Sequence, residues 1–329
     1  MSSGKSNAPA WRTAVAPYEH SDLWQSLWAL ANTLLPFLAL WYLMLRSLTL
    51  SYWITLALAL PAAGLYVRLF TIFHDCGHGS FFKARWANDL VGFLTGILTM
   101  VPYYQWRHDH NVHHATTGNL DKRGIGDIDT LTVEEYRALP RLRRLQYRLY
   151  RHPAILLLLG PLVKFGLIER FVTGTGGKKE RYSVYITNAA VLAIVALVIW
   201  QVGLKAFLLV HLPIMWIGGA SGIGLFYVQH QFEGTVWARQ GKWQFADAAL
   251  HGSSFLRLPR VLDWFTGSIG YHHIHHLSPR IPNYRLARCH KENPMFQLKA
   301  ITFAQAAQSF SLGLWDEAQQ RLVGFRKVV

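Results

Sequence analysis

Three histidine clusters are the part of this sequence whose residue types and spacing could do chemistry. They read HDCGH over residues 74–78, HDHNVHH over 108–114 and HHIHH over 272–276. Residues three and four positions apart share one face of a helix, so each cluster can present two or three imidazoles together. Neutral imidazole is the commonest protein metal ligand. The histidines with this spacing are His74, His78, His110, His113, His114, His272, His275 and His276.

The number of histidines bears on the kind of metal site. A zinc ion takes about four protein ligands, so eight imidazoles suit two first-row metals with open positions. The chain has only two cysteines and no Cys or Met set for copper, and no Glu-x-x-His of the carboxylate di-iron bundles. The clusters therefore predict a histidine-rich site for two iron ions (Fe²⁺/Fe³⁺). His108 and His273 fall off these faces, and we expect His273 to pack or to support a ligand.

Membrane spans are the elements that must position these histidines. Hydrophobic residues make up 51% of the 329 residues and charged residues 16%, against about 25% charged in a soluble domain. Runs near 27–45, 50–70, 184–201 and 204–228 are long enough to cross roughly 30 Å of hydrocarbon. The shorter or more charged stretches 88–104 and 153–172 are expected to be interfacial helices. The predicted fold is all-α and integral to the membrane, with four transmembrane helices in two hairpins and a histidine-rich di-iron cap.

The charge distribution predicts which side of the membrane carries the site. A net charge of +15 could indicate a nucleic-acid partner, but the basic residues are interspersed with Trp, Tyr and apolar runs, which favours lipid. In the two-hairpin topology only Arg46 and Lys205 among the basic residues lie on the far side. The basic runs 141–151 and 178–181 and all three clusters lie on the near side. The positive-inside rule therefore places both termini and the site in the cytoplasm.

Domain boundaries follow from the same pattern. We expect a cytoplasmic N-terminal segment over 1–26, which lacks the features of a signal peptide. Residues 27–295 carry the spans and all three clusters and form one membrane domain. Residues 296–329 are expected to be a cytoplasmic C-terminal tail.

The order HxxxH, HxxHH, HxxHH between paired spans resembles the integral-membrane fatty acid desaturases. The flanking stretches HDCGHGSFF, WRHDHNVHHATTGNLDKRGIGDIDTLT, YVQHQFE and WFTGSIGYHHIHHLSPRIPNYRL are similar to the bacterial and cyanobacterial acyl-lipid enzymes of the delta-12 (omega-6) kind. The resemblance covers roughly residues 50–295. It implies a ninth histidine ligand at His230. In the animal acyl-CoA branch an Asn four residues before that histidine helps to hold a metal through water, and Phe226 stands there in this chain.

The same resemblance implies an O2-dependent reaction that introduces a double bond into a fatty acyl chain. Its partners would be the acyl substrate, membrane lipid and an electron donor, and its location the bacterial inner membrane. The sequence has no CxxC, flavin or fused cytochrome motif, so the electrons should come from a separate protein such as ferredoxin. We expect no nucleic-acid partner.

Carboxylates that orient the ligands are expected beside the clusters, because a metal-bound imidazole usually donates its other N–H to a carboxylate or carbonyl. The candidates are Asp75, Asp109, Asp127 and Asp129, of which Asp127 and Asp129 match the family pattern.

Other functions stay open at the level of sequence. A hydroxylase, or an oxidative decarboxylase that forms a terminal alkene from a free fatty acid, would use the same ligands. A non-catalytic membrane metal binder or transporter would need polar or charged residues along the spans to line an ion path. The four spans have almost none, and Asn188 and His211 are isolated.

Overall fold

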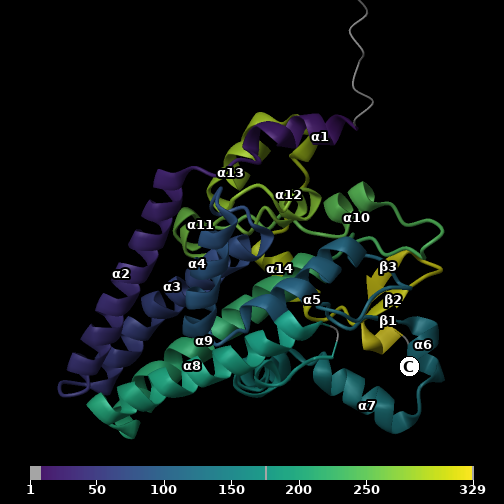
Figure 1. The fold of residues 1–329 in the computed structure, drawn as a ribbon. Coiled ribbons are helices and arrows are strands. Elements are labelled where there is room, and N and C mark those ends of the chain that lie inside the picture. Colours follow the sequence, from purple (N-terminus) through teal and green to yellow (C-terminus); the bar gives the residue numbers. More distant parts are fainter. Residues whose placement is uncertain (1–8, 175, 328–329) are drawn as a thin grey trace, which may run out of the picture.

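Two helical hairpins form the body of the protein (Figure 1). A computed structural model describes residues 9–174 and 176–327. The first hairpin consists of α2 (Leu23–Ser47) and α3 (Tyr52–His78), and the second of α8 (Lys178–Val202) and α9 (Leu204–His230). Within the described part of the chain, these four helices are long and apolar enough to cross a membrane, which confirms the predicted spans.

Two of the helices are longer than the sequence pattern indicated. With 27 residues each, α3 and α9 are roughly 40 Å long, about 10 Å more than the hydrocarbon core. The apolar run ends near residue 70 in α3, but the helix continues to His78 because its last turns are buried in the protein. Both extended ends point away from the hairpin turns (Figure 1). The extra length carries histidines beyond the membrane.

Helix α3 is the central helix of the bundle and packs against α2, α4 and α9. Small residues permit this close approach: a Cβ on Gly218 of α9 would lie 2.8 Å from the Tyr66 ring of α3 and 3.3 Å from the Ala63 carbonyl oxygen. Small residues at helix interfaces serve the same purpose in other membrane bundles. At the far end, Gly203 (φ 82°) separates α8 from α9.

Short helices form a cap over the ends of α3 and α9 (Figure 1). The helices are α4 (Arg85–Leu98), α5 (Tyr103–Thr116), α6 (Val133–Ala138), α10 (Phe245–His251), α11 (Arg260–Phe265), α12 (His272–Leu277) and α13 (Asn283–Glu292). The stretch 88–104, which was expected to be an interfacial helix, begins inside α4 and ends at the start of α5.

The second stretch expected at the interface, 153–172, is irregular. It contains two π-helical turns, η2 (Ile155–Leu159) and η3 (Leu162–Leu167), followed by the 3-10 turn η4 (Ile168–Arg170). Together with the preceding α7 (Arg141–Tyr150) it forms a pair bent by 63°. Leu158, Leu159, Leu162 and Leu167 are exposed, as expected of a segment that contacts lipid.

Both ends of the described part of the chain pack against the cap. The N-terminal α1 (Ala10–Val15) and η1 (Ala16–Tyr18) contribute Val15 and Tyr18 to a core that includes Ile274 of α12. The C-terminal part contains η5 (Pro294–Phe296), α14 (Phe303–Ser309), β2 (Leu314–Asp316), β3 (Arg321–Val323) and η6 (Phe325–Lys327).

A small sheet joins the C-terminal part to the loop after the second histidine cluster. Strand β1 (Leu131–Thr132) pairs in parallel with β2, and β2 pairs antiparallel with β3. Trp315 of β2 is 1% exposed and packs with Leu120 and Trp237. The segment that the sequence set apart as a tail after residue 295 is thus folded onto the cap through its buried apolar residues.

We expect Trp315→Ala to lower the free energy of unfolding by about 3–5 kcal/mol, because a large buried side chain is removed. Phe303→Ala is the matched control, since Phe303 is 53% exposed. The measurement is the thermal unfolding midpoint of the purified protein in detergent. Equal midpoints for the two variants would contradict a folded C-terminal segment.

Candidate metal centre

Four elements bring nine histidines together where the bundle meets the cap. The last turn of α3 carries His74 and His78, and the end of α9 carries His230. Helix α5 carries one triplet and α12 the other, at positions i, i+3 and i+4. Their residues are His110, His113 and His114 on α5, and His272, His275 and His276 on α12.

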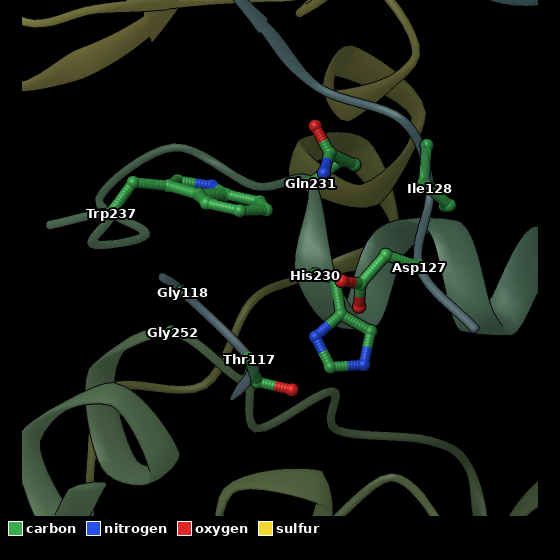
Figure 2. Close-up of a pocket in the computed structure, with 8 residues that line it drawn as sticks. All are labelled: Thr117, Gly118, Asp127, Ile128, His230, Gln231, Trp237 and Gly252. Atoms are coloured by element: carbon green, nitrogen blue, oxygen red, sulfur yellow. The ribbon is translucent and has the colours of Figure 1, made fainter. Parts of the chain in front are cut away.

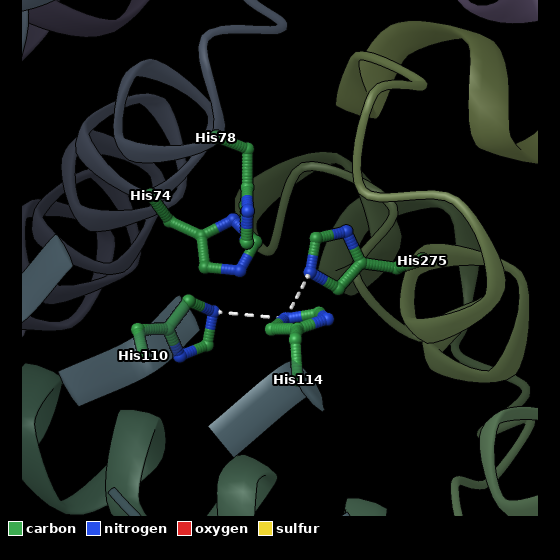
Figure 3. A group of neighbouring side chains, drawn as sticks. All are labelled: His74, His78, His110, His114 and His275. Carbon is green, nitrogen blue, oxygen red and sulfur yellow. Dashed lines mark hydrogen bonds between the residues drawn. The ribbon is translucent and has the colours of Figure 1, made fainter. Parts of the chain in front are cut away.

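Five of these side chains form a first group (Figure 3). One ring nitrogen from each lies within 4.8 Å of the corresponding nitrogen of every other member. His114 Nε2 is 3.1 Å from His110 Nε2 and 3.1 Å from His275 Nε2. The members are His74, His78, His110, His114 and His275.

Three more histidines form a second group: His113, His230 and His276, whose ligand nitrogens lie within 4.8 Å of one another. His113 Nε2 is 3.2 Å from His230 Nε2. His272 borders this group, since its Nε2 lies 3.0 Å from that of His230 and 3.1 Å from that of His276. The lone His230, expected only from the resemblance, therefore lies among the cluster histidines.

The arrangement of nitrogens fits bound cations. His114 Nε2 faces two other ring nitrogens, and one nitrogen carries at most one proton, so hydrogen bonding alone cannot satisfy the group. The buried His78 Nε2 has no hydrogen-bond partner among the described residues. Burial also lowers the pKa of His110, His114 and His275 below the usual value. These rings are therefore neutral at pH 7, the state in which imidazole binds metal.

Two of the four candidate carboxylates hold a ligand ring. Asp127 accepts a hydrogen bond from His113 Nδ1. Asp75 Oδ1 lies 3.2 Å from His74 Nδ1, and its Oδ2 accepts from the Asn283 backbone N–H at 2.7 Å. Each contact leaves Nε2 of that ring directed toward its group.

The other two carboxylates lie elsewhere. Asp109 Oδ2 accepts from the Thr173 hydroxyl at 3.3 Å. The Asp129 side chain is exposed, whereas its backbone carbonyl points inward and accepts from Tyr147 and Arg151. The inward carbonyl explains why this carboxylate, expected beside a ligand, faces solvent instead.

Aromatic rings surround the histidines. Trp106 stacks on His110 with ring centroids 4.3 Å apart. The Phe226 ring lies 5.2 Å from that of His113 and 5.0 Å from that of His230. Neither ring supplies a ligand atom, so both make the borders of the groups apolar.

His273 lies outside both groups, as its helical position predicted. Its Nε2 bonds the Phe296 carbonyl oxygen at 2.8 Å. This contact joins α12 to the C-terminal part of the cap.

A small cavity lies beside the second group (Figure 2). It measures about 10 Å³, which is the space of one water molecule and too small for a hydrocarbon chain. Its walls are Thr117, Gly118, Asp127, Ile128, His230, Gln231, Trp237 and Gly252.

The comparison with known families agrees with this geometry. A family model described as "Fatty acid desaturase" matches residues 48–303, which include all nine histidines. The chain belongs to this family. It is a membrane-integral oxidoreductase of fatty acyl chains, as the resemblance of its sequence motifs implied.

Individual relatives show the same relationship. A fatty acid desaturase of Bacillus subtilis is 48% identical over 315 residues, covering 95% of this chain and 90% of the relative. An sn-1 oleoyl-lipid 12-desaturase of Synechocystis is 30% identical over 249 residues, covering 73% and 68%. A chloroplastic omega-6 fatty acid desaturase of Arabidopsis thaliana is 31% identical over 254 residues, covering 73% and 54%.

Two histidines of α12 offer a matched test of the groups. His275→Ala should abolish activity and lower the iron content, because His275 Nε2 belongs to the first group. His273→Ala should keep most of both, since that side chain bonds a backbone carbonyl. Metal analysis and a turnover assay on the purified variants make the comparison. Equal losses would show that α12 has a different register.

Proposed function

We propose that this desaturase acts on membrane lipids with O2 and two iron ions held by nine histidines. The observation that carries the proposal is the convergence of ring nitrogens into two separate groups. Bound iron supplies O2 activation and the oxidation of an unactivated C–H bond, chemistry that side chains alone lack. The first ion would be held by the five-histidine group. The second would be held by His113, His230 and His276, with His272 beside them.

The backbone of two helices sets the separation of the ions. Consecutive residues His113 and His114 of α5 belong to different groups, as do His275 and His276 of α12. Each of these two rigid helices would thus supply ligands to both ions. This explains why the two clusters share the pattern HxxHH.

The surrounding residues orient the ligands and exclude water. Asp75 and Asp127 accept from the Nδ1 atoms of His74 and His113, which fixes the ring orientation. Trp106 and Phe226 border the groups with apolar rings. A dry border around reacting groups prevents side reactions.

The Synechocystis relative named as an oleoyl-lipid desaturase supports a lipid-linked acyl chain as substrate. The location of the site supports the same conclusion, since His74, His78 and His230 lie at the ends of membrane helices. We assign the catalytic domain to residues 27–295, flanked by the segments 1–26 and 296–329.

The electron donor in this proposal is a ferredoxin-like protein in the cytoplasm. A second Synechocystis relative, 28% identical, is named sn-1 acyl-lipid omega-3 desaturase (ferredoxin). The basic residues lie mainly on the side of the cap, and a basic face attracts an acidic donor. By the positive-inside rule this side and both termini face the cytoplasm of a bacterial inner membrane.

Lipid analysis tests the proposal. The chain is expressed with a ferredoxin and its reductase in a bacterial host whose lipids lack polyunsaturated chains. Gas chromatography with mass spectrometry should then show a new internal double bond that depends on O2 and iron, and that His275→Ala does not produce. A hydroxylated chain, or an alkene one carbon shorter, would contradict desaturation.

A further inference from the structure

One arginine of the basic run 141–151 differs from its neighbours in being buried. Arg151 follows α7 and is 2% exposed, whereas Arg141 and Arg143 are exposed. A charge run usually marks a solvated or lipid-facing surface, and the sequence alone gives no reason to separate Arg151 from it. The burial of a full charge calls for compensating contacts.

One end of the Arg151 guanidinium binds the loop that follows the second cluster. Nη1 donates to the Asp129 carbonyl oxygen at 2.8 Å and to Thr130 Oγ1 at 3.3 Å. This loop also carries Asp127, the partner of His113. Arg151 therefore holds the loop whose Asp127 orients His113, one ligand of the second group.

Nη2, the other end, binds the last turn of α9 and the C-terminal segment. It donates to Gln231 Oε1 at 2.7 Å, to the Tyr227 hydroxyl at 3.1 Å and to the Leu312 carbonyl oxygen at 3.1 Å. Gln231 is the residue directly after His230. The same guanidinium thus holds Tyr227 and Gln231, which lie before and after the second ligand, His230.

The partners of the Arg151 guanidinium are also hydrogen-bonded to one another. Gln231 Nε2 donates to Thr130 Oγ1 at 2.9 Å, and the Tyr227 hydroxyl donates to the Leu312 carbonyl oxygen at 2.9 Å. All partners of the guanidinium are neutral oxygens. Hydrogen bonds to a charged donor are roughly twice as strong as neutral ones, so these contacts offset the burial of the charge.

We propose that Arg151 is a positioning residue for the second iron site, acting by fixing the His113–Asp127 loop relative to His230. The inference rests on the proposed function, because it assumes two ions. His113 Nε2 and His230 Nε2 lie 3.2 Å apart and come from segments that Arg151 connects. The first group receives its ligands from α3, α5 and α12 and does not depend on this connection.

The planar fork of arginine suits this role. Three segments are held by two nitrogens that point in fixed directions. A lysine ammonium is a single point donor on a flexible stem, so it cannot reach all of them. We therefore expect lysine to restore the function only in small part.

The test measures iron directly in the full-length protein, purified in detergent and loaded with ⁵⁷Fe. Wild type should hold two irons per chain. Arg151→Met and Arg151→Lys should lose iron from one site, with roughly 10- to 100-fold weaker affinity, as for other residues that orient ligands. Mössbauer spectra and the kinetics of iron release to a chelator should show one class of iron lost and the other retained.

Arg148→Met is the matched control from α7, the helix that precedes Arg151. Arg148 donates to the Tyr136 hydroxyl at 2.5 Å and lies over the Phe325 ring, so it contributes to packing but contacts neither ligand segment. This variant should keep both irons. Retention of both irons by the Arg151 variants, or loss of both sites together, would overturn the proposal.

If Arg151→Met does not fold, the Thr130→Val variant tests the positioning role instead. It removes the hydroxyl that accepts from both Arg151 and Gln231 while keeping the side-chain shape. Faster release of one iron supports the positioning role, and wild-type release contradicts it. A wild-type protein that itself holds fewer than two irons would instead refute the proposed function.

Discussion

The structure depends on the need to gather nine imidazoles into two adjacent groups. A protonated imidazole cannot bind metal, and a crowd of charged rings would repel itself. Burial is the largest cause that lowers the pKa of the α5 and α12 histidines for which a shift is resolved. The same burial removes water as a hydrogen-bond partner, and several ring nitrogens, among them His78 Nε2 and the Nδ1 atoms of His114 and His275, have no partner among the described residues.

The arrangement of helices follows from this constraint. Helices α3 and α9 are longer than the membrane requires, and the extra turns provide His74, His78 and His230 at fixed positions. Helices α5 and α12 cross over these ends and each divides its triplet between the two groups. The cap is then stabilised from both ends of the chain, by Val15 and Tyr18 against α12 and by the β-strands beside the second cluster.

Much of this could be predicted from the sequence, because helical spacing is a local property. The spans and the eight cluster histidines follow from periodicities of one helix at a time. His230 has no spacing partner, and only the resemblance to a family indicated it. Asp127 and Asp129 look alike in the sequence, but the tertiary contacts of the Asp129 carbonyl turn its side chain outward.

Burial was the property that the sequence could not reveal. Arg151 belongs by composition to a basic run, yet its guanidinium is enclosed by three segments from distant parts of the chain. Trp315 likewise lies in a stretch that was expected to be a tail, and it is buried in a strand that pairs with residues 183 positions earlier. Long-range packing decides both cases, and no local pattern records it.

The most direct test of the account is an anomalous difference map of the iron-loaded protein, measured at the iron absorption edge. Two iron peaks are predicted, one within His74, His78, His110, His114 and His275, and one bounded by His113, His230, His272 and His276. A single peak, or a second ion bound by other residues, would contradict the division of the nine histidines into two metal sites.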